Sequence, residues 1–349
     1  MGIPSNTNAS SSAFGWQFQT HAALVLMLRD IKDIDSIRVE GATDDIEIYY
    51  TDKHVDYAQA KARTTNEPGK GSPQRFKDAL HTLAKDAQQK NCLNAIYVTN
   101  DVFPLGKSHN DIKFDYDSFL TFSELSPDQQ KYITAKLHEL LNGESDADSL
   151  IATLENHLAI YVMWFYGKDA STRTKATIRA IENFLAAIDP QSVSKYSAKL
   201  YSLWTDVLTS NAATLKTDVA VSKSELIWPL IVLLTEVNPN DKFFDTYDDE
   251  VVQDVIERYG QIIGETTERY DIISQVLSDF DQYKHDHHGV SKQLREDFTA
   301  KNIDQYRSLI GADELDTDEA NCITALVVKK IIANRGVIAE IKEKVNLDN

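Results

Sequence analysis

The chain has 349 residues, of which 42% are hydrophobic and 26% charged, and a length prior of roughly 150 residues per domain predicts two domains. Its 13 Gly and 8 Pro exclude a collagen-like, low-complexity or wholly disordered protein. Two cysteines, Cys92 and Cys322, are too few for a disulfide framework or a cysteine-based zinc cluster. The best apolar run, 226–234, is shorter than the ~20 residues of a membrane span, and no secretory signal opens the chain, so we expect a cytoplasmic protein.

The net charge of −18 comes from 54 acidic and 36 basic residues. Because binding to phosphates requires a positive surface, this charge argues against a passive nucleic-acid coat. Both halves of the chain are acidic, but one local stretch contains a single acid, Glu67, and the basic residues Lys61, Arg63, Lys70, Arg75 and Lys77. If the protein binds a polyanion, we expect it to do so there.

Small polar residues at positions 1–12 predict a flexible tail, and apolar residues at helical spacing predict an amphipathic helix from Phe14 to about Ile31. Three strands are expected over 36–40, 45–50 and 55–62, the second of which alternates strictly between apolar and polar residues. A helix over 74–89 and a buried strand over 95–99 follow. This order predicts an α/β domain, with a mixed sheet flanked by helices, over residues 13–145.

The pattern changes after Ser126, where Pro127 opens a helix that ends at Asn142-Gly143. From residue 146 onward the periodicity is almost entirely helical. Helices are expected over 149–166, 171–188, 192–208, 224–236, 249–263, 270–283 and 321–344. We therefore expect an all-α C-terminal domain over 146–349, with a role in regulation or partner docking.

The stretch 40–61 carries the residues most suited to chemistry. Glu40 ends one strand, Asp44 and Asp45 open the next, and Gln59 and Lys61 lie two apart on the third. In a small antiparallel meander these positions can converge at one edge of the sheet. Two or three oxygen ligands bind a hard cation such as Mg²⁺, and a nearby lysine can orient water and stabilise charge on a phosphate. The pattern predicts metal-dependent hydrolysis of a phosphodiester.

These residues resemble the restriction-endonuclease-like fold (the PD-(D/E)xK superfamily), whose signature is Pro-Asp followed by Asp/Glu-x-Lys. The arrangement is similar to the double-stranded-DNA nuclease domains of bacterial anti-phage effectors. Those domains begin with a helix carrying Gly-x-x-Phe-Gln and continue with a Glu, an Asp-Asp-Ile element and Gln-x-Lys. The matching elements, within residues 13–125, are Gly15-Trp16-Gln17-Phe18-Gln19, Glu40, Asp44-Asp45-Ile46 and Gln59-Ala60-Lys61.

The resemblance implies an endonuclease, dependent on Mg²⁺ or Mn²⁺, that cuts double-stranded DNA in bacterial defence against phages or plasmids. It implies that the catalytic residues are Glu40, Asp45, Gln59 and Lys61, the first three as metal ligands, with Gln19, Glu47 and Asp44 in support. The ligand on the second strand stays open among its three acids, because Asp45 and Glu47 share a face. Contacts to DNA are expected from Arg63, Lys70, Arg75 and Lys77.

An all-helical C-terminal domain does not look like a cyclic-oligonucleotide sensor, which is an α/β domain. It favours the arrangement of Lamassu-type defence systems, in which the nuclease subunit works with an SMC-like ATPase and an accessory subunit. We expect activation by a partner or by homo-oligomerisation. Because Gln59 replaces the usual carboxylate, the alternative is a catalytically silent interaction subunit with a decayed nuclease scaffold in a multi-protein complex.

Overall fold

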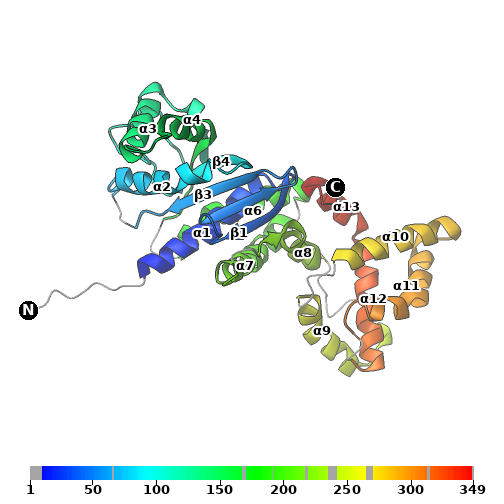
Figure 1. Cartoon of the computed structure of the whole chain (residues 1–349). Coiled ribbons are helices and arrows are strands. Elements are labelled where there is room, and N and C mark those ends of the chain that lie inside the picture. The colour runs from blue at the N-terminus through cyan, green and yellow to red at the C-terminus, as the bar shows by residue number, and fades with distance from the viewer. Residues whose placement is uncertain are drawn as a thin grey trace, which may run out of the picture. The chain divides into compact units, whose positions relative to one another are not determined.

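The computed structural model describes residues 10–64, 67–166, 170–190, 192–216, 219–234, 242–264, 270–312 and 315–347. These residues form two compact units, Met1–Lys223 and Ser224–Asn349, which we name the α/β unit and the helical unit (Figure 1). Positions 1–9 of the expected tail lie outside the described residues, and positions 10–12 already belong to the first helix.

A mixed seven-stranded sheet in the order β5-β6-β4-β3-β2-β1-β7 forms the centre of the α/β unit. The strands are β1 (Ile34–Val39), β2 (Ile46–Tyr50), β3 (Val55–Lys61), β4 (Cys92–Thr99), β5 (Ser118–Thr121), β6 (Leu158–Val162) and β7 (Val221–Ser222). Strands β1, β2 and β3 form the expected antiparallel meander. Strand β4 pairs in parallel with β3 and β6, and both edge strands pair antiparallel to their neighbours.

Helices cover both faces of this sheet. The helices of the α/β unit are α1 (Ser10–Arg29), α2 (Ser72–Asp86), α3 (Pro127–Leu140), α4 (Ala147–His157), α5 (Ala170–Arg173), α6 (Lys175–Ile188) and α7 (Ser192–Ala212), with a 3₁₀ turn, η1 (Phe122–Glu124). Val55 and Tyr57 of β3 pack with Phe76 and Leu80 of α2 in one core cluster. Because successive strand residues face opposite ways, the intervening residues of β3 face the side where α1 packs. The sheet is therefore buried on both faces.

The expected helix over 149–166 is wrong in its second half, where the chain forms β6. The run Leu158–Val162 is buried throughout between β4 and β5. A strand covered on both faces has no apolar–polar alternation, so its apolar run is easily taken for part of a buried helix. Strands β6 and β7 extend the α/β unit to Lys223, well beyond the boundary expected at residue 145.

The C-terminal region is helical, as expected, with its compact unit beginning at Ser224. It contains α8 (Lys223–Leu234), η2 (Lys242–Thr246), α9 (Asp249–Gly264), α10 (Tyr270–Asp286), α11 (Ser291–Arg307), α12 (Thr317–Ala333) and α13 (Arg335–Val345). The single helix expected over 321–344 is two helices that meet at Asn334, and α11 was not expected. None of the helices described is long and apolar enough to cross a membrane.

Candidate functional site

A tight turn joins β1 to β2 and places two acids side by side. The Glu40 amide donates to the carbonyl oxygen of Asp45 at 2.8 Å, and the Gly41 amide donates to that of Asp44 at 2.9 Å. Glu40 has a φ of 55°, in the left-handed region that few residues other than glycine adopt. This backbone conformation ends β1 at Val39 and reverses the chain direction, so Glu40 lies at the edge of the sheet where β2 begins.

Asp45 contacts the end of β3. Its Oδ2 accepts a hydrogen bond from the Ala60 amide at 2.9 Å and lies 3.8 Å from Nζ of Lys61. Both side chains remain partly exposed. Lys61 and Asp45 thus lie at the same edge of the sheet, as the sequence pattern predicts. Gln59 is buried and, two residues before Lys61, lies on the same face of β3.

Gln19 of α1 reaches this edge from the first helix, whereas Gln17 is exposed. Burial raises the pKa of Glu40, and the charge of Asp45 raises it further, while a hydrogen bond from Gln19 and the charge of Lys61 oppose this. The buried Oε1 atom of Gln19 has no hydrogen-bond partner in the structure. Since a buried oxygen without a partner is costly, this atom suits an additional ligand.

Glu47 has a structural role in the turn between β1 and β2. Its carboxylate accepts hydrogen bonds from the Thr43 amide at 2.8 Å and from the Tyr49 hydroxyl. A Cβ atom at Gly41 would lie 2.4 Å from the Glu47 carboxyl carbon, so only glycine allows this approach. Glu47 therefore closes the turn instead of facing Lys61.

Asp44 is buried against Asp86, the last residue of α2. Burial, followed by the hydrogen bond and the charge of Asp86, raises the pKa of Asp44. Because two buried carboxylates in contact cannot both ionise at low cost, the raised pKa of Asp44 favours its protonated form. Of the three acids left open by the sequence, Asp45 is the one placed beside Lys61.

The basic stretch after β3 is mostly engaged inside the fold. The side chain of Arg63 is only 4% exposed, its Nε donates to the Tyr166 hydroxyl at 2.7 Å, and its guanidinium lies over the Tyr166 ring. The expectation that Arg63 contacts DNA is thereby corrected. Arg75 pairs with Asp101 at 2.9 Å. Lys70 and Lys77, with side chains 62% and 35% exposed, pair with acids at the surface.

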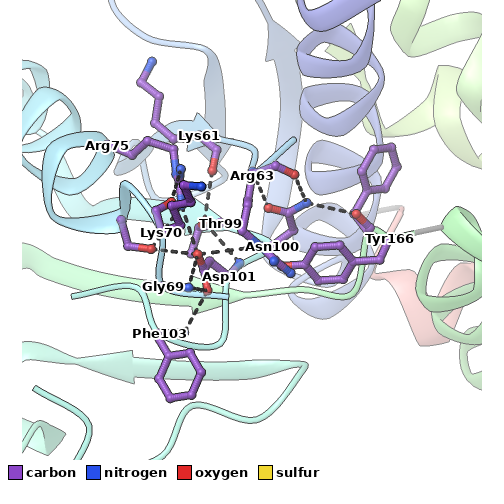
Figure 2. A network of polar contacts seen from close by, with 12 residues as sticks. Lys61, Arg63, Gly69, Lys70, Arg75, Thr99, Asn100, Asp101, Phe103 and Tyr166 are labelled. Atoms are coloured by element: carbon purple, nitrogen blue, oxygen red, sulfur yellow. Dashed lines mark hydrogen bonds and ion pairs between the residues drawn. The ribbon is translucent and has the colours of Figure 1, made fainter. Parts of the chain in front are cut away.

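Asp101 is the centre of a buried network that sequence analysis missed (Figure 2). Its carboxylate accepts hydrogen bonds from the Gly69 amide at 2.9 Å, from the Ser72 hydroxyl at 2.7 Å and from Arg75. The network joins the end of β4 to the loop before α2. A polar pair, Asn100-Asp101, directly after a buried strand is the signal that could have identified it.

A second set of bonds in Figure 2 fixes the end of β3. The Thr99 hydroxyl donates to the carbonyl oxygen of Lys61 at 2.9 Å, and the Asn100 amide group donates to that of Arg63 at 3.1 Å. Thr99 ends the buried strand β4 and Asn100 follows it, so the two side chains tie the backbone of Lys61 and Arg63 to the end of that strand. The network therefore fixes the backbone of Lys61 through its carbonyl oxygen and makes no bond to its side-chain amine.

The donor set is suited to a cation that keeps open coordination positions. Within the described ranges, no group of three or more His, Cys, Asp or Glu side chains could hold a metal ion. Glu40 and Asp45 offer two carboxylates, Gln19 hydrogen-bonds Glu40, and Gln59 offers an amide on the face of β3 that carries Lys61. Mg²⁺ is usually bound by one or two carboxylates together with water and substrate phosphates, so this set fits Mg²⁺ or Mn²⁺. Comparison of the chain with protein families, with curated proteins and with solved structures finds no match.

Proposed function

We propose that this protein is a metal-dependent endonuclease that hydrolyses phosphodiester bonds of double-stranded DNA, in defence against phages or plasmids. The observation that carries the proposal is the 3.8 Å approach of Lys61 to Asp45, at an edge that also holds Glu40 and Gln19. The meander β1–β2–β3 followed by the parallel strand β4 supports a restriction-endonuclease-like interpretation of the sheet.

In this proposal, Glu40, Asp45 and Gln59 would hold Mg²⁺ or Mn²⁺, with Gln19 Oε1 as a further donor. The bound cation would supply positive charge for the phosphate and lower the pKa of a water molecule. Lys61 would hydrogen-bond the attacking water or a phosphate oxygen and stabilise the negative charge that develops there. Hydrolysis forms a bond between the water oxygen and phosphorus as the bond from phosphorus to one bridging oxygen breaks.

Contacts to the DNA backbone would come from Lys70 and Lys77. Their present partners, Glu67 at 3.1 Å and Glu139 at 2.8 Å, are surface acids. Exposed ion pairs contribute little, so a phosphate could replace either acid at low cost. Arg75 would act indirectly, because its pairing with Asp101 holds the start of α2 in place.

The active form in this proposal is an assembly. One such site cuts one strand, so a double-strand break requires two sites and a homo-oligomer. The chain carries a net charge of −18, which opposes both self-association and approach to DNA. Partner binding by the helical unit, with an SMC-like ATPase and an accessory subunit, would offset this repulsion and make cleavage conditional.

One observation favours a second candidate, the catalytically silent interaction subunit. The candidate site has two carboxylates and an amide at Gln59, and an amide binds a metal more weakly than a carboxylate does. In this case the α/β unit would serve as a scaffold within a multi-protein complex. Metal binding and cleavage distinguish the two candidates.

The decisive experiment measures plasmid cleavage and Mn²⁺ binding by the full chain, alone and with its co-purifying partners. We expect Lys61→Ala and Asp45→Asn each to lower cleavage by at least about a hundredfold, because the first removes a positive charge beside the reacting phosphate and the second removes a metal ligand. Lys85→Ala, which removes an exposed lysine of α2, is the matched control and should cut like the wild type. Cleavage that survives Lys61→Ala would contradict the assignment, and a chain that neither binds Mn²⁺ nor cuts with its partners would be the silent subunit.

DNA binding is tested separately with the double variant Lys70→Gln/Lys77→Gln. Loss of two phosphate contacts should lower the slope of log affinity against log salt by about 2. The control, Lys85→Gln/Lys90→Gln, removes the same charge from exposed positions near the end of α2. Equal slopes in the two double variants would show that DNA does not bind along this stretch.

A further inference from the structure

The helical unit contains a cavity of about 670 Å³ lined by residues of α11, α12 and the segment around η2. Helices α11 and α12 pack against each other within this unit (Figure 1). Small and aliphatic side chains line it, among them Ala300, Ile303 and Ala325. Its size falls within the range of sites for small molecules, and such sites are mostly apolar with a few polar groups.

Two aromatic rings form part of the lining. Phe243 and Tyr247 lie with ring centroids 5.3 Å apart and planes inclined by 35°. Aromatic faces stack well with another planar ring, so this part of the cavity suits a ligand with a flat apolar body. Nζ of Lys329 lies 4.7 Å from the centroid of the Phe243 ring, which adds a positive charge beside the same surface.

The charged residues of the lining are mainly positive. Lys292, Arg295 and Lys329 face a single acid, Glu296, which lies 3.9 Å from Lys292. Arg295 uses Nε to donate to the backbone oxygen of Ser291, a bond that does not involve the two terminal nitrogens. The compact unit that contains them has 26 acidic and 13 basic residues, so this local positive charge stands against strongly negative surroundings.

We infer that this cavity binds a small amphipathic anion, a molecule with a planar aromatic body and one acidic group such as a carboxylate or sulfonate. Burial of the aromatic body against Phe243, Tyr247 and the alanines provides affinity. The cations fix the orientation of the acidic group and favour the anion over a neutral molecule of the same shape. The inference goes beyond the proposed nuclease activity, because no residue of the α/β unit takes part.

The test uses two fluorescent probes with the same ring system on the full-length chain. One is 8-anilinonaphthalene-1-sulfonate, and the other is N-phenyl-1-naphthylamine, which lacks the sulfonate. We expect saturable binding of one sulfonate probe per chain, at least about tenfold tighter than the neutral probe, since charge-assisted contacts are stronger than neutral ones. Absence of saturable binding, or equal affinity for both probes, would overturn the inference.

Variants locate the site. Arg295→Gln/Lys329→Gln should reduce the affinity for the sulfonate about tenfold and leave the neutral probe unchanged, because only the charged contacts are lost. Lys284→Gln/Lys301→Gln removes the same charge from exposed positions outside the lining and should change neither affinity. Ala325→Trp fills the cavity and should abolish binding of both probes, with near-ultraviolet circular dichroism as the check on folding. An equal loss of affinity for the sulfonate in Arg295→Gln/Lys329→Gln and in Lys284→Gln/Lys301→Gln would contradict a localised site.

Discussion

The interiors of the two units differ in the kind of residue that they bury. The α/β unit buries ionisable side chains that include Asp44, Asp56, Asp86 and Asp101. Among the described residues of the helical unit, no Asp, Glu, Lys, Arg or His side chain is buried; the hydroxyl of buried Thr324 donates to a carbonyl of its own helix, and that of buried Tyr306 donates to Asp279. The α/β unit thus maintains buried polar networks at a cost in free energy, whereas the helical unit is stabilised by apolar packing.

Because of this difference, each unit can place reactive or binding side chains in different parts of its structure. Buried networks fix side chains firmly enough to hold a reacting group, and in the α/β unit they surround the edge with Lys61 and Asp45. In the helical unit, polar function is confined to the surface and to the cavity lined by Arg295 and Lys329. Replacements that act on one kind of interior and spare the other test this comparison.

The largest effect is expected from Asp101→Ala. The substitution leaves Arg63 without its buried carboxylate and removes the hydrogen-bond acceptor of the loop before α2. Breaking a buried pair by removing one partner costs about 4 kcal/mol, so we expect a loss of that size in the unfolding free energy of the α/β unit. Chemical denaturation followed by circular dichroism measures it. Asp304→Ala, which removes an exposed acid of the helical unit, should leave the melting temperature unchanged.

The apolar counterpart is Leu326→Ala in the core of α12, where Leu326 is fully buried. Truncating a buried leucine removes its contacts and leaves a cavity, so we expect a loss of about 3 kcal/mol. Differential scanning calorimetry should show a lower transition for the helical unit and an unchanged transition for the α/β unit. One merged transition that shifts as a whole would show that the two interiors do not unfold separately.

A matched pair of buried threonines sharpens the comparison. Thr177 of α6 contacts Nδ1 of His21 at 2.8 Å, and burial, followed by the charge of Arg173, lowers the pKa of His21 to about 4. Thr177→Val leaves a neutral buried imidazole with one nitrogen unpaired, which should cost about 2 kcal/mol. Thr324→Val loses only a bond to a carbonyl within α12 and should be neutral within about 0.5 kcal/mol. Equal losses in urea unfolding would contradict the contrast between the interiors.

Sequence reasoning succeeded where local periodicity decides the structure. The alternation in 45–50 and 55–62 predicted β2 and β3, and it placed Asp45 and Lys61 at one edge of the sheet. It failed at β6, because this inner strand is buried on both faces and so lacks the alternation. The extent of the α/β unit depends on such long-range pairing, which no local window of sequence records.

Sequence reasoning about the candidate site failed for a similar reason. Glu47 and Asp45 are equivalent by alternation, and only the approach of Glu47 to Gly41 separates their roles. Arg63 belongs to a basic run in the sequence, but Tyr166, about a hundred residues later, holds it inside the fold. Partners distant in sequence decide whether a charge is exposed, so composition alone assigned Arg63 to the surface.

The smallest expected effect concerns the pH dependence of stability, which follows from Asp56. Burial raises the pKa of Asp56 to about 6, although hydrogen bonds from Tyr50 and Asn94 oppose the shift; the charge of Asp30 adds to it. A carboxyl whose pKa is higher in the folded state binds more protons there than in the unfolded chain, between pH 4 and 6. Its contribution to stability is therefore greatest at low pH and disappears as the pH rises through about 6.

Between pH 5 and pH 8 this single group should lower the unfolding free energy of the α/β unit by about 1 kcal/mol. Asp56→Asn should remove that part of the slope, because an amide keeps an oxygen that accepts the hydrogen bond from Asn94 and cannot ionise. Burial also raises the pKa values of Asp44 and Asp86. Because both residues are present in the wild type and in the variant, the difference between the two pH profiles isolates Asp56. Urea unfolding at pH 5 and pH 8 gives the slope, with the exposed Asp148→Asn as control. Parallel pH profiles for wild type and Asp56→Asn would mean that Asp56 is already ionised in the folded interior, and the polar network would then be held by charge and not by a shared proton.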